Sequence, residues 1–336
     1  MMPAQDPSAF KFGPSSCALG PHATGTQSAK HLCNANFSSA TIYYPTGDGL
    51  PPLLPSVVIV GGWGCGEHAM AAWGPFYASH GIVAMTIGTP TPWHDSPAAR
   101  CRALLDASVA LQSEHEREGS AVQGRLAVER RAVQGYSLGG GGAQMAGLSD
   151  QTLKCVIALC PNEGELSPTA ERLSFPTEQR ASSVPVLIIC GEKDSWDANP
   201  KTQAWPQYHQ TTATKLIVEV TGGDHYVANG PSGGNQHGLE AGAGVDMFCN
   251  FMSSFACQLC CPPAHWCVPF SGGTLDGPSG HAADHAPRGA IGGMALAWLR
   301  LFLLGQESVR SQLVIRPDIA SGFECSGVEA PQAMHR

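Results

Sequence analysis

The chain has 336 residues, of which 43% are hydrophobic and 14% charged, and its formal net charge is -8 at pH 7. Such a length and apolar content allow a sizeable folded core, so intrinsic disorder is not expected. The charges are spread thinly and form no basic stripe that would neutralise phosphates, so nucleic acid is not an expected partner. No uninterrupted apolar run reaches the ~18 residues of a membrane-spanning helix, and no integral membrane segment is expected.

The cellular compartment stays open. Residues 1–30 contain no apolar core after a basic start, so no secretory signal is visible and a cytoplasmic location is the default expectation. The protein would be secreted if its true start lay elsewhere. The 13 cysteines would be paired in an exported protein and reduced in the cytosol. The oligomeric state is likewise not determined by the sequence.

Residues 1–40 are rich in Gly, Pro, Ser and Ala and lack periodicity, so we expect a loosely ordered N-terminal segment ahead of a single domain over 41–336. In that domain, short apolar runs alternate with helical patterns. The predicted strands are Thr41–Tyr44, Val57–Val60, Ile82–Ile87, Ala132–Gln134, Cys155–Leu159, Val186–Cys190 and Leu216–Val220. The predicted helices are Ser96–Leu111, Gly140–Leu148 and Ile291–Leu304. This alternation predicts an α/β fold with a doubly wound, mostly parallel central sheet and helices on both faces.

Residues 237–289 do not fit this alternation. They are rich in Gly, Pro and Cys, and the tetrapeptide Gly-Pro-Ser-Gly occurs at Gly230–Gly233 and again at Gly277–Gly280. We therefore expect an irregular insertion. The insertion contains a group of possible zinc ligands: Cys257, Cys260, Cys261, His265 and Cys267. Their spacing is too loose to favour a zinc site over disulfides or free thiols. No metal and no cofactor is predicted.

The strongest motif is Gly135-Tyr136-Ser137-Leu138-Gly139, which lies between a predicted strand and a predicted helix. A serine hydroxyl is a poor nucleophile unless a sharp turn presents it to a base, and small residues on either side make room for that turn. The following helix start adds free N–H groups and a partial positive charge. The motif predicts Ser137 as a catalytic nucleophile.

A catalytic acid and a base should follow the serine in that chain order. Asp194 comes just after the predicted strand Val186–Cys190, and His225 follows Leu216–Val220 after a Gly-Gly turn. Because the carboxyl ends of parallel strands share one edge of the sheet, we expect both side chains near Ser137. His225 would accept the serine proton, and Asp194 would orient the imidazole. Asp224 adjoins His225 in sequence and is a poorer candidate for the acid.

The backbone N–H groups of Trp63 and Leu138 are the predicted oxyanion-hole donors. Leu138 directly follows the nucleophile, and Trp63 lies in the loop Val60-Gly61-Gly62-Trp63-Gly64 after a predicted strand. Glycines in such a loop let the backbone approach a substrate closely.

With these residues in view, the chain resembles the bacterial cutinase and polyester-hydrolase (PET hydrolase-like) family. The resemblance is carried by Tyr43-Tyr44-Pro45, Val60–Pro75, Gly135–Gly142, Asp194, Gly222–His225, Val227-Ala228-Asn229 and Ala297–Phe302. It implies the α/β-hydrolase fold and a serine esterase that cleaves small-molecule or polymeric carboxylic esters through an acyl-enzyme.

The chain departs from the family pattern at Asn162, at the C-terminal disulfide and in the insertion at 237–289 that follows His225. Asn162 stands where many polyester hydrolases carry a substrate-stacking tryptophan. Asn162 and Trp196 are therefore the candidate substrate contacts. The side chain of Trp63 could offer further apolar surface to the substrate. The family's C-terminal disulfide has one apparent partner here, Cys325, with no cysteine after it.

Two other functions fit parts of the pattern. A short-chain or lipid esterase of the platelet-activating-factor acetylhydrolase type shares these motifs, and substrate profiling separates it. A catalytically inactive α/β-hydrolase-fold binding protein is the alternative from another class, because the insertion at 237–289 follows His225 closely. A dienelactone hydrolase would normally carry a cysteine in place of Ser137.

Overall fold

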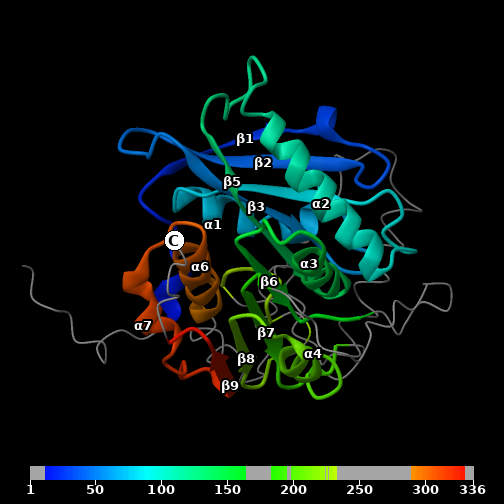
Figure 1. Ribbon diagram of the computed structural model, residues 1–336, viewed down its shortest axis with the longest axis vertical. Coiled ribbons are helices and arrows are strands. Elements are labelled where there is room, and N and C mark those ends of the chain that lie inside the picture. Colours follow the sequence, from blue (N-terminus) through cyan, green and yellow to red (C-terminus); the bar gives the residue numbers. More distant parts are fainter. Residues whose placement is uncertain are drawn as a thin grey trace, which may run out of the picture.

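A computed structural model describes residues 12–163, 183–194, 198–223, 225, 227–232 and 289–329. Within these residues the chain forms a nine-stranded sheet in the order β1-β2-β4-β3-β5-β6-β7-β8-β9 (Figure 1). The six central strands from β4 to β8 pair in parallel, while β1, β2 and β9 pair antiparallel at the two margins. The predicted mostly parallel, doubly wound sheet is confirmed.

The strands are β1 (Ala23–Ser28), β2 (Ser39–Thr46), β3 (Leu54–Val60), β4 (Val83–Gly88), β5 (Leu126–Tyr136), β6 (Cys155–Leu159), β7 (Val186–Gly191), β8 (Lys215–Val220) and β9 (Ala320–Ser326). The α-helices are α1 (Trp73–Ser79), α2 (Pro97–Ser113), α3 (Leu138–Ser149), α4 (Ala204–Gln210), α6 (Ala290–Phe302) and α7 (Arg310–Leu313). Short 3-10 helices occupy Pro14–Cys17, Lys30–Leu32, Glu67–Met70 and Glu307–Val309.

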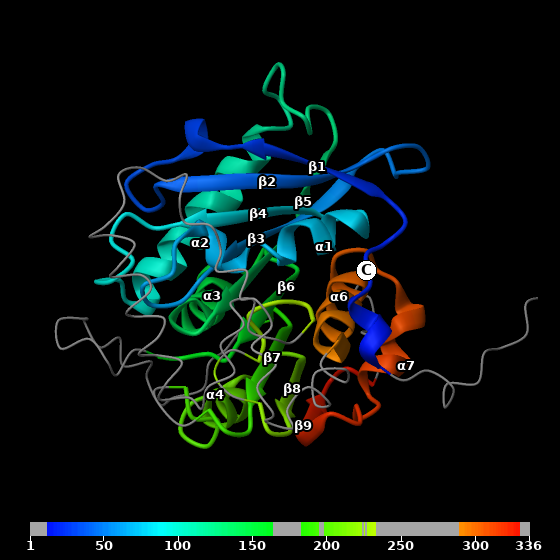
Figure 2. The same ribbon diagram turned by 180° about the vertical axis from the view of Figure 1, so that it is seen from behind.

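Two hydrophobic clusters fill the two faces of the sheet. One joins the sheet to α1, α6 and α7, and the other joins it to α2, α3 and α4 (Figures 1 and 2). Strands β3, β4, β6 and β7 are buried at every position, as strands covered on both faces must be. The fold therefore has three layers, with the sheet in the middle.

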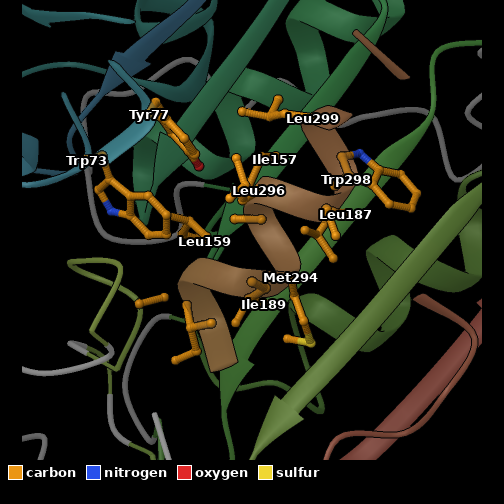
Figure 3. Close-up of a cluster of buried hydrophobic side chains, with 14 of the residues drawn as sticks. Trp73, Tyr77, Ile157, Leu159, Leu187, Ile189, Met294, Leu296, Trp298 and Leu299 are labelled. Atoms are coloured by element: carbon orange, nitrogen blue, oxygen red, sulfur yellow. The ribbon is translucent and has the colours of Figure 1, made fainter. Parts of the chain in front are cut away.

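Helix α6 supplies much of the first cluster. Figure 3 shows Leu296 of α6 beside Ile157 of β6 and Met294 of α6 beside Ile189 of β7, with Trp73 of α1 near Leu159. The indole of Trp298 is fully buried. This packing fixes a segment far along the chain against the central strands.

Helix α2 begins as its sequence predicts. The hydroxyl of Ser96 accepts a hydrogen bond of 3.2 Å from the N–H of Ala99, and Pro97 occupies the first turn. Both features stabilise a helix N-terminus, because they satisfy or remove donors that have no partner inside the helix.

The N-terminal segment differs from the expectation. Within residues 1–40, predicted to be loosely ordered, Ala23–Ser28 forms β1 and pairs antiparallel with β2. This edge strand is largely exposed, so its sequence has no apolar run to reveal it. The prediction of loose order is therefore wrong for Ala23–Ser28. Nearly all of the predicted insertion at 237–289 lies outside the described residues, and its structure stays a prediction.

Other elements were missed for similar reasons. The half-buried strand β9 and the seven-residue helix α4 carry little periodicity. In the described part of the chain, no helix is both long and apolar enough to cross a membrane.

Candidate active site

The candidate site lies at the carboxyl edge of the sheet, where the strand order reverses. Strand β3 pairs with β4 on one side and with β5 on the other, in parallel with both. Connections therefore leave β3 and β5 toward opposite sides and open a crevice between them, which is where open α/β sheets bind ligands. The loop at Gly61 follows β3 and Ser137 follows β5.

The Gly-x-Ser-x-Gly turn depends on the contact between its two glycines. A Cβ atom added at Gly135 would lie 1.8 Å from the carbonyl oxygen of Gly139, and one added at Gly139 would lie 2.4 Å from that of Gly61. Neither position accepts a side chain. The turn holds Ser137 at φ 55° and ψ -121°, a region that residues with a Cβ rarely adopt. The Ser137 N–H donates to Leu159 O at 2.8 Å, which fixes this backbone.

Ser137, His225 and Asp194 come together from three different loops. The Nε2 atom of His225 lies 3.0 Å from Ser137 Oγ, and its Nδ1 atom lies 2.7 Å from Asp194 Oδ2. Asp194 is 2% exposed and Ser137 7%, while the side chain of His225 between them is 25% exposed. This geometry orients one ring nitrogen toward the carboxylate and the other toward the hydroxyl.

The loops that carry the acid and the base are joined to each other. The Lys193 N–H donates to Gly223 O at 2.7 Å, and the Gly222 N–H donates to a carboxylate oxygen of Glu192 at 2.7 Å. Tyr136 adds a third link, because its hydroxyl donates to the His225 carbonyl at 2.9 Å. The backbone at His225 is therefore held from two sides.

The loop after β3 approaches the nucleophile closely. A Cβ atom added at Gly62 would lie 2.6 Å from Ser137 Cβ, so only glycine fits there. Neither the Trp63 N–H nor the Leu138 N–H donates a hydrogen bond within the described residues. Two backbone N–H groups without a hydrogen-bond partner in the described residues, close to a serine hydroxyl, are compatible with the predicted oxyanion hole.

A buried arginine stabilises this loop. Arg100 of α2 is fully buried and donates to Gly62 O at 2.8 Å and to Cys65 O at 3.5 Å. Its Nε atom lies 2.9 Å from an oxygen of Asp95. Burial lowers the pKa of Arg100 and the Asp95 carboxylate opposes that shift, so the guanidinium keeps its charge at neutral pH.

Comparisons with known proteins place the chain in a family. The model of the PET hydrolase-like family matches residues 6–266. The chain belongs to the PET hydrolase-like family. It is thus a member of a family of carboxylic ester hydrolases, with the α/β-hydrolase fold that the sequence predicted.

The relatives that the chain resembles include proteins named as cutinases, a bis(hydroxyethyl) terephthalate hydrolase and a lipase. A cutinase of Thermobifida fusca is 31% identical over 242 residues, which are 68% of this chain and 73% of that protein. A bis(hydroxyethyl) terephthalate hydrolase of Streptomyces coelicolor is 38% identical over 214 residues, 62% of each chain. Lipase 1 of a Moraxella species is 29% identical over 209 residues, 62% of this chain and 59% of that protein.

Two tryptophans pack against each other in this PET hydrolase-like protein, one of them the residue of the predicted oxyanion-hole amide. The indoles of Trp63 and Trp93 meet edge to face with centroids 4.8 Å apart, and Trp63 Nε1 donates to Trp93 O at 2.8 Å. Both side chains are half-buried. They form a partly accessible aromatic pair between the loop after β3, which carries Trp63, and the segment between β4 and α2, which carries Trp93.

The two predicted substrate contacts have different outcomes. Trp196 lies outside the described residues. The side chain of Asn162 is buried, and the backbone N–H of Asn162 donates to Ser137 O at 3.0 Å. In this structure Asn162 supports the turn at the nucleophile, and its contact with substrate stays a prediction.

Sequence reasoning missed four residues around the site: Arg100, Tyr136, Trp93 and Cys160. The sulfur of Cys160 and ligand atoms of Asp194 and His225 all lie within 4.8 Å of one another. Tyr136 precedes Ser137 within the Gly-x-Ser-x-Gly motif, so its closeness to the site could have been predicted from the sequence. The other three reach the site only through the fold, and no local pattern marks them.

Proposed function

We propose that this protein hydrolyses carboxylic esters by a serine mechanism, with Ser137 as nucleophile, His225 as base and Asp194 as its partner. The observation that carries the proposal is the pair of contacts at 3.0 Å and 2.7 Å that connects Ser137 Oγ through His225 to Asp194. Family membership supports the same chemistry.

The reaction has two halves. In the first, Ser137 Oγ attacks the ester carbonyl while His225 Nε2 accepts its proton, and the oxyanion is stabilised by the N–H groups of Trp63 and Leu138. The protonated imidazole then gives its proton to the leaving alcohol, which leaves an acyl-enzyme. In the second half, His225 removes a proton from water, which attacks the acyl group and releases the acid. Asp194 stabilises the imidazolium in both halves.

The substrate class follows from the surroundings of Ser137. The aromatic pair Trp63–Trp93 supplies apolar contact area beside one oxyanion donor. Asn162 replaces the tryptophan of many polyester hydrolases and is buried, so one stacking surface for an aromatic acyl group is missing. We therefore place small or aliphatic esters, including aliphatic polyesters of the cutin type, ahead of aromatic polyesters.

Lipid esters are the second candidate. The similarity to a lipase favours it, and a preference for long acyl chains would distinguish it from short-chain ester hydrolysis. Inactivity on every ester by a folded protein would instead favour a binding function.

The test is hydrolysis of p-nitrophenyl esters from acetate to palmitate by the wild type and by Ser137→Ala. Loss of the nucleophile in a triad removes activity by on the order of 10⁶-fold. Ser149→Ala is the matched control, because this exposed hydroxyl lies at the other end of α3, where it bonds Met145 O and the thiol of Cys101. Equal activity of the wild type and Ser137→Ala would overturn the proposal.

A further inference from the structure

A thiol lies beside the acid and the base without a place in the proposed hydrolysis. Cys160 directly follows β6, the neighbour of β7, whose carboxyl end leads to Asp194. It is fully buried, and its backbone has φ 43°, a conformation that costs about 1–3 kcal/mol in a residue with a Cβ. The Cys160 N–H donates to Ile189 O at 2.7 Å. The thiol is therefore held in position by the same strands that position Asp194.

Asp194 has an unsatisfied oxygen. Its Oδ2 atom pairs with His225, while Oδ1 is buried and has no hydrogen-bond partner within the described residues. A carboxylate in such a position normally has a partner for each oxygen, because burying an unpaired charged acceptor is costly. The Oδ1 atom of Asp194 is therefore available to coordinate a cation.

The three donors form a metal-binding set. The sulfur of Cys160, a carboxylate oxygen of Asp194 and a ring nitrogen of His225 all lie within 4.8 Å of one another. Ligands bound ~2.0–2.3 Å from a tetrahedral zinc ion lie ~3.3–3.8 Å from one another. The three donors, which lie within 4.8 Å of one another, therefore need to move by about 1 Å to surround an ion, and the 2.7 Å contact between Asp194 Oδ2 and His225 Nδ1 has to open. One thiolate, one imidazole and one carboxylate suit a thiophilic divalent ion and leave a fourth position open.

We propose that Cys160, Asp194 and His225 form an inhibitory binding site for a thiophilic divalent cation of the Zn²⁺ type. On binding, the S–H bond of Cys160 breaks, the sulfur coordinates the ion and the proton leaves to solvent, with no change of oxidation state. The two anionic ligands and the dication sum to zero charge, which a buried site tolerates better than the isolated carboxylate.

Metal binding at this site blocks the base. An ion on Nδ1 leaves the imidazole proton on Nε2, so the nitrogen that faces Ser137 Oγ at 3.0 Å cannot accept the serine proton. An ion on Nε2 occupies the lone pair itself. Either mode stops ester cleavage reversibly. The inhibition, unlike the binding, rests on the proposed function.

Binding is tested first, in the full-length Ser137→Ala protein after removal of metal with EDTA. Co²⁺ serves as a spectroscopic probe and Zn²⁺ is titrated in competition with a chromogenic chelator. Cysteines elsewhere in the chain can also bind metal, so each measurement is a difference from the same protein with Cys160→Ser added. We expect one fewer equivalent of Zn²⁺ and a weaker thiolate-to-cobalt absorption band in the Cys160→Ser protein. Identical stoichiometry and spectra would overturn the site.

Cys155→Ala is the matched control, because Cys155 is buried at the other end of β6; it should keep the full stoichiometry. If Cys160→Ser is unstable, Cys160→Ala and His225→Ala replace it, and each should lose the same equivalent.

Inhibition is then measured on p-nitrophenyl esters, with each variant normalised to its own rate in EDTA. Zn²⁺ should inhibit the Ser137-containing protein, EDTA should restore its rate, and Cys160→Ser should need at least tenfold more Zn²⁺. Equal sensitivity of both proteins would refute inhibition through Cys160. An inactive wild type that still shows the Cys160-dependent equivalent would refute the proposed hydrolysis and leave the metal site standing.

Discussion

The guanidinium of Arg100 donates a 2.8 Å hydrogen bond to the carbonyl oxygen of Gly62. This carbonyl belongs to the same peptide unit as the Trp63 N–H. Because the C=O and N–H of a planar trans peptide point in opposite directions, holding the oxygen toward Arg100 turns the N–H toward the opposite side. Arg100 is therefore a positioning residue for the Trp63 amide.

Substitution of Arg100 should impair turnover more than substrate binding. We expect Arg100→Lys, which keeps the charge beside Asp95, to lower kcat about 10–100-fold with a small change in KM, since one oxyanion donor contributes ~10²–10³. Steady-state kinetics on p-nitrophenyl butyrate measures this. Arg102→Lys, exposed on the same helix, should retain wild-type kcat. An unchanged kcat in a folded Arg100→Lys protein would refute the positioning role.

Gly62 should tolerate no side chain. The Cβ of Gly62→Ala would meet Ser137 Cβ at 2.6 Å, and a shift of ~1 Å at a reacting group costs on the order of 10²-fold in rate. We expect that loss in kcat/KM. Gly66→Ala is the control, because a Cβ there has no atom within 4 Å and its φ is -81°. Similar rates for the two variants would contradict the close approach at Gly62.

Tyr136→Phe should have a milder effect. The hydroxyl of Tyr136 anchors the His225 carbonyl at 2.9 Å, but the loop is also held by the bond from Lys193 to Gly223. A neutral hydrogen bond contributes ~1 kcal/mol, so a decrease of up to about tenfold in kcat is expected. Tyr44→Phe on β2 should leave kcat unchanged. A loss above a hundredfold would mean that Tyr136 does more than hold this loop.

Acid stability should depend on Glu114, which follows α2. Burial alone would raise the pKa of its carboxyl, but hydrogen bonds from Arg117, His31 and Ser120 outweigh burial and lower the pKa to about 2. A carboxyl whose pKa is lower in the folded state adds stability above its unfolded value, and this is lost as pH falls toward the folded value. The window is therefore from about pH 4.5 down to about pH 2.

The measurement is the free energy of unfolding in urea as a function of pH for the wild type and Glu114→Gln. The variant should be less stable at pH 7 by ~2–3 kcal/mol, and this difference should shrink below pH 4.5. Glu116→Gln, at an exposed neighbour, is the control. A difference between wild type and variant that does not vary with pH would show that the Glu114 charge is not responsible.

The sequence was most informative where a strand is covered on both faces. Strand β6 has the predicted bounds Cys155–Leu159, because every position is buried and apolar. Strand β5 was predicted only over Ala132–Gln134, since its earlier part includes exposed polar residues. Edge strand β1 has no apolar run at all.

The same reasoning applies to the site. Ser137, Asp194 and His225 were predicted from their positions after strands, and the structure brings them together. Their catalytic roles stay a proposal that the ester assays test. Arg100 and Cys160 meet the site through contacts between distant segments, so neither spacing nor composition marks them. The thiol of Cys325 approaches Glu329 at 3.4 Å, a contact that the family's disulfide pattern did not suggest.

The backbone at Ser137 carries a consequence for engineering. Its φ of 55° suits glycine, so Ser137→Gly should unfold at a higher temperature than Ser137→Ala, with a gain of up to about 1 kcal/mol. The position of the proposed nucleophile is thus one where we expect heat resistance and activity to oppose each other. A search for thermostable variants that does not also select for turnover would drift toward losing the nucleophile.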